Sequence, residues 1–149
     1  MTSPPIDQLI ERLELDPHPE GGYYRETWRA DRQIPGESLD GIPGGRRAAS
    51  SILYLLPEGE TSEWHRLRAE EIWLHQLGDP LELQIQPTES APVRRHVLGT
   101  DERLQAAVPA RAWQRAEVAS GEAGYALVGC VTVPGFEFQD FELRGESTD

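Results

Sequence analysis

The sequence from Gly59 to Gly78 is Gly-Glu-Thr-Ser-Glu-Trp-His-Arg-Leu-Arg-Ala-Glu-Glu-Ile-Trp-Leu-His-Gln-Leu-Gly. Within this stretch, His65 is followed six residues later by Glu71, and a second histidine, His75, follows Glu71 by four residues. The spacing from His65 to Glu71 suits two adjacent antiparallel strands whose side chains point into one cavity. A histidine and a carboxylate that face each other inside a barrel indicate either a metal site or an acid–base pair.

Four residues of this stretch have the spacing of the first sequence motif of the cupin superfamily, Gly-x5-His-x-His-x3-Glu-x6-Gly. Gly59, His65, Glu71 and Gly78 stand at motif positions, and Leu67 stands where the family has its second histidine. The stretch therefore resembles a cupin motif that lacks one histidine.

The second cupin motif, Gly-x5-Pro-x-Gly-x2-His-x3-Asn, is similar to the stretch that begins at Gly99. Pro109 matches, Arg111 replaces the glycine and Gln114 replaces the last histidine. Other phrases resemble a subgroup of small single-domain cupins, with an RmlC-like jelly roll, that is grouped as a domain of unknown function. These phrases lie within residues 9–143 and are Pro-His-Pro-Glu-Gly-Gly-Tyr-Tyr-Arg-Glu-Thr (17–27), Trp-His-Arg (64–66), Glu-Glu-Ile-Trp (70–73), Gly-Asp-Pro-Leu (78–81), Gly-Cys-Val-Thr-Val-Pro-Gly-Phe (129–136) and Asp-Phe-Glu-Leu (140–143).

The resemblance implies an all-β fold, the double-stranded β-helix or jelly-roll barrel, with a polar pocket at one end. It also implies a homodimer that pairs through sheet edges. It implies no particular reaction, because cupins host many chemistries on one barrel.

The pattern of apolar residues by itself predicts an all-β sandwich or barrel. About ten short segments with alternating or continuous apolar residues are separated by turns. They span about residues 21–29, 49–56, 62–67, 70–77, 81–86, 93–98, 104–108, 113–118, 125–133 and 136–143.

The remaining segments complete a single domain over residues 1–149. A helix is expected over residues 3–15, with Ser3 as its N-cap and one apolar face. The barrel then covers about residues 20–143, and the tail 144–149 is expected to be disordered. Residues 30–45 are rich in glycine and proline and are expected to form a surface loop, and the sequence leaves open whether this loop covers the pocket.

The composition limits the classes of partner. The 149 residues suffice for one domain with its own core, and the net charge is −12. This acidic balance argues against nucleic-acid and anionic-membrane partners, which need clustered positive charge. The sequence has no apolar run of membrane-spanning length, no secretory signal and a single cysteine, Cys130, so a cytoplasmic protein without disulfides is expected.

One hypothesis is a metal-dependent enzyme such as a dioxygenase. Its ligands would be His65, Glu71 and Gln114, with His75 as an addition if it faces inward, and the metal would be a divalent ion such as Fe, Ni, Mn or Zn. Because Leu67 supplies no ligand and an amide is a weak one, the sequence favours a site without a cofactor.

The favoured hypothesis is metal-free acid–base catalysis. His65 would be the general base, and Glu71 would orient its ring and raise its basicity. The resemblance to the metal-free sugar-nucleotide epimerases of the cupin superfamily implies that a tyrosine returns the proton, and Tyr24 and Tyr54 are both candidates. The substrate would be a small sugar- or nucleotide-like metabolite that is isomerised or epimerised. A third hypothesis is a non-catalytic module that binds a small molecule in the same pocket.

Further polar residues are candidates for substrate binding. Arg25 and Glu26 lie on opposite faces of one strand, so one of them is expected to face the cavity. Gln114 and His75 could form a hydrogen-bonding wall. His18 and His96 are not assigned a role in binding, and His18, which stands between two prolines, is expected to be structural.

Two interpretations, ligand binding or an ordinary structural position, are open for the tryptophans and for one arginine pair. The tryptophans at positions 64, 73 and 113 could stack on a planar ligand or pack in the core, and Trp73 is the one placed in the pocket here. The pair Arg46-Arg47 could bind a phosphate or carboxylate, but a solvated surface pair is favoured. Cys130 lies in an apolar strand and is expected to be a core residue.

Overall fold

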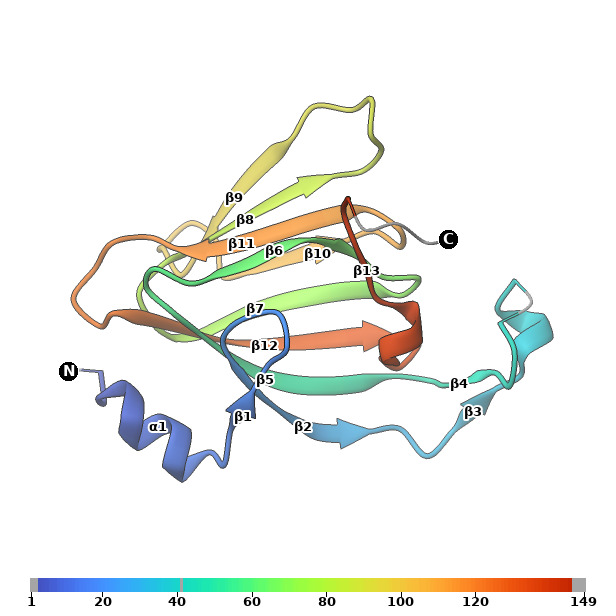
Figure 1. Cartoon of the computed structure of the whole chain (residues 1–149), viewed down its shortest axis with the longest axis horizontal. Helices are drawn as coiled ribbons and strands as arrows, with labels where there is room; N and C mark the ends of the chain where they lie inside the picture. The colour runs from blue at the N-terminus through green and yellow to red at the C-terminus, as the bar shows by residue number, and fades with distance from the viewer. Residues whose placement is uncertain (1–2, 41, 146–149) are drawn as a thin grey trace.

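The structure of the protein is a computed structural model that describes residues 3–40 and 42–145. Two antiparallel sheets face each other and enclose the core, and one α-helix, α1 (Ile6–Arg12), lies near the N-terminus (Figure 1). The predicted all-β jelly roll with an N-terminal helix is confirmed. The six-stranded sheet has the spatial order β1 (Asp16–Pro17), β2 (Tyr23–Arg29), β5 (Ser50–Pro57), β12 (Tyr125–Val133), β7 (Glu70–Gly78) and β10 (Gln105–Val108).

The five-stranded sheet lies opposite and completes the barrel. From β5 to β13 the chain passes to the other sheet after every strand except β8, so neighbouring strands are often far apart in sequence. This alternation places β12 between β5 and β7, and it brings residues from several strands to one cavity (Figure 1). The second sheet has the order β13 (Glu142–Leu143), β6 (Thr61–Arg66), β11 (Trp113–Val118), β8 (Leu81–Gln86) and β9 (Arg94–Leu98).

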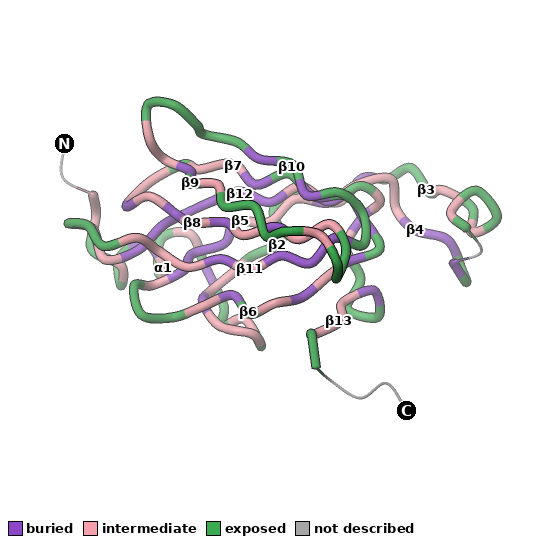
Figure 2. The backbone as a smooth tube through the Cα atoms, turned by 90° about the horizontal axis from the view of Figure 1, so that it is seen from above, coloured by how far each residue is buried: buried purple, intermediate pink, exposed green. Residues whose placement is uncertain are grey.

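The core lies between the sheets because apolar residues alternate along the strands. In β8, Leu81, Leu83 and Ile85 are buried, whereas Glu82 and Gln84 are only partly covered. Figure 2 shows buried positions recurring along most of the strands. Each buried leucine contributes about 1.5–3 kcal/mol to folding relative to an exposed one, so the alternation determines which face of each strand points inward.

Helix α1 covers part of the outer face of the six-stranded sheet. Leu9 packs with Leu55 and Leu127 in a second apolar cluster outside the barrel core. The helix is shorter than the predicted 3–15, because Pro5 has an extended backbone and residues 16–17 pair with β2. The predicted N-cap at Ser3 is wrong, since the helix begins after two prolines and has no side-chain cap.

The predicted loop 30–45 contains secondary structure. Residues of β3 (Gln33–Ile34) pair with β4 (Arg46–Arg47), and a 3-10 turn, η1 (Gly36–Ser38), lies between them. This hairpin projects from one end of the barrel, beyond β2 and β5 (Figures 1 and 2).

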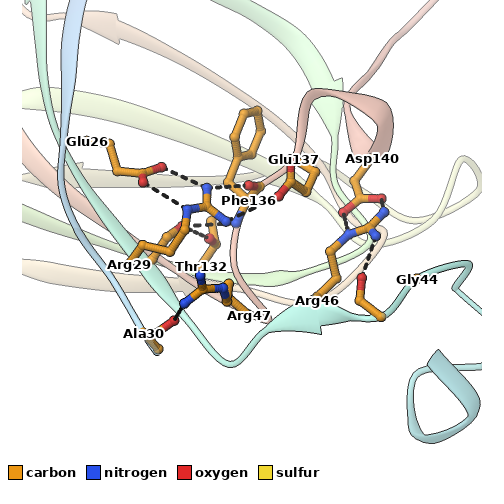
Figure 3. Close-up of polar contacts among 12 residues, drawn as sticks. Glu26, Arg29, Ala30, Gly44, Arg46, Arg47, Thr132, Phe136, Glu137 and Asp140 are labelled. Atoms are coloured by element: carbon orange, nitrogen blue, oxygen red, sulfur yellow. Dashed lines mark hydrogen bonds and ion pairs between the residues drawn. The ribbon is translucent and has the colours of Figure 1, made fainter. Parts of the chain in front are cut away.

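The segment after β12 differs most from the prediction. A strand over 136–143 was expected, but only Glu142–Leu143 pairs with β6, and a 3-10 turn, η2 (Phe138–Asp140), precedes it. The reason is a buried ion pair, in which Arg46 donates to both carboxylate oxygens of Asp140 at 3.0 and 2.7 Å (Figure 3). Asp140 must turn inward to meet this guanidinium, and that turn interrupts strand geometry.

The same ion pair shows that Arg46 and Arg47 are not both the solvated surface residues that the sequence predicts. Arg46 is only 5% exposed, so the solvated-pair prediction is wrong for it. Arg47 remains partly exposed and donates to the Ala30 carbonyl at 2.8 Å (Figure 3). Neither arginine lines the cavity between the two sheets.

The C-terminal tail is described only in part. Residues 146–149 of the predicted disordered tail lie outside the described residues. Arg144 is described, and its guanidinium stacks on the rings of Trp64 and Trp113 at 4.7 and 4.6 Å. No helix in the described part of the chain has the length and apolar composition needed to cross a lipid bilayer.

Replacing Asp140 by alanine should destabilise the protein strongly, because Arg46 would be left buried and unpaired. The loss of one partner of a buried ion pair lowers the free energy of unfolding by about 3–5 kcal/mol. Urea denaturation measures this value. The matched control is Asp31→Ala, because Asp31 is fully exposed and 3.8 Å from Arg47; this variant should unfold like the unsubstituted protein. Equal stabilities of the two variants would contradict the prediction.

Candidate functional site

A cavity of about 290 Å³ opens between the two sheets near the C-terminal segment. Strands β2, β5, β6, β7 and β12 supply its walls, together with the aromatic residues of the segment after β12. His65 and Glu71, which the sequence pairs, both line it. None of the described residues of segment 30–45 lines it, so this segment does not cover the pocket.

His65 is held in one orientation by its neighbours. It lies on β6, is 8% exposed, and its Nδ1 is 2.7 Å from the Glu63 carbonyl oxygen. Because a carbonyl oxygen only accepts, Nδ1 carries the proton and Nε2 keeps its lone pair. The ring stacks on Phe141 at 5.0 Å. Burial lowers the pKa of His65 to about 4, so the imidazole is neutral at pH 7.

Glu71 is a buried carboxyl group that forms no salt bridge with any residue that the structure describes. It lies on β7, and its Oε1 accepts a hydrogen bond from Gln114 Nε2 at 2.9 Å. Gln114 Oε1 in turn accepts from Trp73 Nε1 at 2.8 Å. Burial raises the pKa of Glu71 from about 4.5 to about 7, although the Gln114 hydrogen bond opposes the shift. Glu71 can therefore take up and release a proton near neutral pH.

The sequence predicts that Glu71 orients the His65 ring, whereas in the structure each of these two side chains is held by another residue. The Glu63 carbonyl fixes the His65 ring, and the Gln114 amide fixes Glu71. Register explains the second contact, because Gln114 pairs with His65 across β11 and β6 and reaches over to β7 in the other sheet. Gln114 is 1% exposed and so forms part of the wall behind the cavity.

The proposed metal ligands do not fit a three-ligand site. The Gln114 oxygen is engaged by Trp73, and Leu67 lines the cavity at the position of the second motif histidine. Residues 3–40 and 42–145 contain no group of three or more His, Cys, Asp or Glu side chains that could hold a metal ion. His65 and Glu71 remain as two donors, fewer than protein sites for Fe, Mn or Zn normally use.

The two candidate tyrosines differ in what their hydroxyl groups do. Tyr54 is buried and donates to the Gly21 carbonyl at 2.8 Å, and desolvation raises its pKa. Tyr24 lines the cavity and is only partly buried. The hydroxyl proton of Tyr54 is therefore already used in a structural hydrogen bond.

His18 is a cavity residue that the sequence interpretation missed. Its Nδ1 accepts the Glu20 backbone N–H at 3.0 Å, and its ring packs edge-on against Tyr24 and Tyr54 at 4.9 and 5.6 Å. Burial lowers its pKa. The turn at Gly21, which has a φ of 106°, folds His18 back beside β2. The Pro-His-Pro-Glu-Gly-Gly phrase is the signal that could have placed it.

Charged groups form the rim of the cavity. Glu26 accepts two hydrogen bonds from Arg29, at 2.8 and 2.7 Å, and Arg29 also donates to Glu137 and the Phe136 carbonyl (Figure 3). Arg25 borders the cavity but pairs with Glu14 at 3.3 Å on the side of α1. Both Arg25 and Glu26 therefore lie at the rim, and each already has a partner.

Other predicted site residues lie elsewhere. His75 donates from Nε2 to the Asp79 carbonyl at 2.7 Å and does not line the cavity. It is four residues from Glu71, which is about 13 Å along a strand, so shared parity does not bring it to the same site. Trp73 lines the cavity, whereas Trp64 and Trp113 stack with arginines outside it. The Cys130 thiol is buried in the wall, which raises its pKa.

The protein is similar to known proteins over nearly its whole length. Residues 7–144 match the model of a family described as Cupin superfamily (DUF985). The chain is similar to a hypothetical protein from Leishmania major, with 35% identity, a TM-score of 0.85, and 93% of this chain and 86% of that chain covered. It is similar to protein SO0799 from Shewanella oneidensis, with 36% identity, a TM-score of 0.79, and coverage of 96% and 85%. The uncharacterised Saccharomyces cerevisiae protein YML079W is 29% identical, with 98% of this chain and 80% of that protein covered.

Replacing Glu71 by glutamine should change how stability depends on pH. The folded-state pKa of Glu71 is raised, so its contribution is fully present below about pH 4.5 and is lost as pH rises through about 7. At about 1.4 kcal/mol per pKa unit, the free energy of unfolding of Glu71→Gln, relative to the unsubstituted protein, should rise by about 3 kcal/mol from about pH 4 to about pH 8. Urea denaturation across this range measures the difference.

The control for this titration is His65→Asn, which should change the slope in the opposite direction. The pKa of His65 is lowered to about 4, so its contribution is present above about pH 6.5 and is lost as pH falls through about 4. The relative stability of His65→Asn should therefore rise toward acid pH. A pH-independent offset for Glu71→Gln would contradict the assignment of the raised pKa.

Replacing Leu67 by histidine should create a metal site, because it adds a third donor beside His65 and Glu71. Excess Ni²⁺ or Zn²⁺ should raise the melting temperature of Leu67→His and leave those of the unsubstituted protein and of Leu67→Asn unchanged. Differential scanning fluorimetry and the metal content after dialysis measure the effect. One metal per chain in the unsubstituted protein, lost in His65→Ala, would overturn the donor-set argument.

Proposed function

The chain belongs to the DUF985 family of the cupin superfamily, and from this premise we propose that it isomerises or epimerises a small polar metabolite. The reaction would be proton transfer at a carbon next to a carbonyl group. The observation that carries this proposal is the Glu71 carboxyl, which lines the cavity with a pKa of about 7 and a fixed hydrogen bond from Gln114.

Glu71, and not His65, is the better general base. A base works best when its pKa is near the operating pH, and the pKa of Glu71 of about 7 meets this condition. The His65 pKa of about 4 makes its imidazole a weak base. Its Nε2 lone pair suits a hydrogen bond from the substrate instead.

Tyr24 is the candidate that returns a proton from the other side of the substrate. Strands β2 and β7 are separated by β5 and β12 in the sheet, which is about 14 Å at about 4.8 Å per strand. Both side chains line the cavity, so a ligand inside it can lie between Tyr24 and Glu71. A base and an acid on opposite sides of a carbon are the arrangement that inversion requires.

The cavity limits the size of the substrate. Its volume of about 290 Å³ lies at the lower end of the range of about 300–1,000 Å³ that small-molecule sites span. A monosaccharide-sized compound fits this volume, whereas a nucleotide sugar could enter only with its sugar, with the remainder beyond the Glu26–Arg29 rim.

A non-catalytic binding module is the second candidate, and the aromatic lining favours it. The rings of Tyr24, Tyr54, Trp73, Phe138 and Phe141 all border the cavity, and such surfaces bind small molecules in many proteins without reaction. The same experiment separates the two candidates.

The test is hydrogen exchange at carbon. The protein is incubated in D₂O with a panel of aldoses, ketoses, their phosphates and nucleoside-diphosphate sugars, and ¹H NMR follows the loss of C–H signals. Glu71→Gln should slow the exchange by about 10²–10⁴-fold, the usual contribution of a general base. In the unsubstituted protein, kcat/KM should fall as pH drops below about 7, because Glu71 becomes protonated.

The matched control is Glu70→Gln, the same substitution at the neighbouring exposed residue of β7. This variant should exchange at the unsubstituted rate. Exchange that persists in Glu71→Gln would exclude Glu71 as the base. Thermal stabilisation by a compound of the panel without any exchange would favour the binding module.

A further inference from the structure

The two histidines of the cavity present opposite hydrogen-bonding groups. A main-chain N–H only donates, so the bond from Glu20 N–H leaves His18 Nδ1 without a proton and puts the proton on Nε2. A carbonyl oxygen only accepts, so the bond to Glu63 puts the proton of His65 on Nδ1 and leaves Nε2 bare. His18 therefore offers a donor at Nε2, and His65 offers an acceptor at the same atom.

Both rings line the cavity, and neither Nε2 atom is sealed from solvent. Neither has a hydrogen-bond partner among the described residues, and both rings line the cavity. No nitrogen or oxygen of a described side chain is both sealed from solvent and unpartnered. The two Nε2 atoms are therefore accessible from the cavity, where a ligand can reach them.

The surroundings keep both imidazoles neutral and fixed in place. The His18 ring packs edge-on against Tyr24 and Tyr54, and the His65 ring stacks on Phe141. Burial lowers the pKa of each ring, and a charge on His18 would lower that of His65 further. A neutral histidine with a fixed N–H can polarise a carbonyl group without transferring its proton completely.

We propose that the substrate is an α-hydroxycarbonyl compound, with its carbonyl oxygen bound by His18 Nε2–H and its adjacent hydroxyl bound to His65 Nε2. This inference rests on the proposed function and assigns its substrate class. An acceptor oxygen and a donor hydroxyl on adjacent carbons match one donor and one acceptor in the wall. A carboxylate has no proton for His65 and would be repelled by ionised Glu71.

The reaction balances with these groups alone. The Glu71 carboxylate takes the proton from the carbon that carries the hydroxyl. The C–H electron pair forms a C–C double bond, and the carbonyl π pair moves to oxygen, where His18 Nε2–H donates to the developing negative charge. Protonation of the same carbon by the Tyr24 hydroxyl gives the epimer, and exchange with water restores Glu71 and Tyr24. No electron is gained or lost.

Binding of an enediolate mimic tests the inference. Erythronohydroxamate carries adjacent C=O and N–OH groups, and it should bind more tightly in calorimetry than erythritol or erythronate. His18→Asn keeps an acceptor for Glu20 N–H but lacks the donor at the ε position, and it should weaken hydroxamate binding by about 10- to 100-fold, the cost of leaving a buried carbonyl oxygen without its donor. His18→Gln places an amide N–H near the ε position and should weaken binding by less than about threefold.

A second measurement needs no substitution. Long-range ¹H–¹⁵N NMR spectra of the unsubstituted protein at neutral pH should identify the Nε2–H tautomer of His18 and the Nδ1–H tautomer of His65. The opposite tautomer at either residue, or a positively charged ring, overturns the inference. Equal effects of His18→Asn and His18→Gln on hydroxamate binding also overturn it.

The outcomes separate this inference from the proposed function. If Glu71→Gln abolishes exchange but His18→Asn binds the hydroxamate normally, the isomerase proposal stands and the substrate assignment fails. If hydroxamate binding depends on His18 as expected but no compound exchanges, the ligand class stands and catalysis is excluded.

Discussion

The hydrogen-bonded chain from Trp73 through Gln114 to Glu71 is the constraint on which the rest of the cavity depends. A buried primary amide has a donor end and an acceptor end, and each needs a partner. Trp73 serves the oxygen and Glu71 serves the nitrogen, so the amide of Gln114 has one orientation. Because Gln114 belongs to one sheet and both partners to the other, the same bonds tie the two sheets together behind the cavity. The position of Glu71 thus follows from core packing.

The hydrogen bonds from Trp73 to Gln114 and from Gln114 to Glu71 also explain how a cupin barrel can hold the buried Glu71 carboxyl at a position where the motif suggests a metal ligand. Leu67 forms an apolar part of the cavity wall, and Gln114 donates a hydrogen bond to Glu71. Neither residue at these two motif-histidine positions therefore leaves an unsatisfied polar group. The two buried carboxyl groups, Asp140 and Glu71, have different kinds of partner. Asp140 is paired with the guanidinium of Arg46, whereas Glu71 has only an amide as its partner, and burial raises the pKa of Glu71.

The sequence predicted the barrel well and the site in part, and particular residues show why. The β8 strand was predictable because Leu81 and Leu83 alternate with polar residues, and burial follows that period. The segment at 136–143 has a similar apolar spacing, but the Arg46–Asp140 pair joins residues 94 apart in sequence, which local patterns do not reveal. His65 and Glu71 were found by motif spacing. His18 was missed because its place depends on the β1–β2 pairing and the turn at Gly21.

The charge state of the cavity favours a carbonyl ligand over an anion. His18 and His65 are both neutral, and Glu71 is near its midpoint at pH 7, so the inner wall carries no full positive charge. The cations at the rim are already engaged, Arg29 by Glu26 and Glu137 and Arg25 by Glu14. Recognition inside must then come from the direction of hydrogen bonds. In a site shielded from water, a neutral donor aimed at a carbonyl oxygen gains strength as negative charge develops there, whereas a ligand that is already anionic must be desolvated before it binds. The arrangement of the wall therefore suits charge that appears during a reaction better than charge that is present from the start.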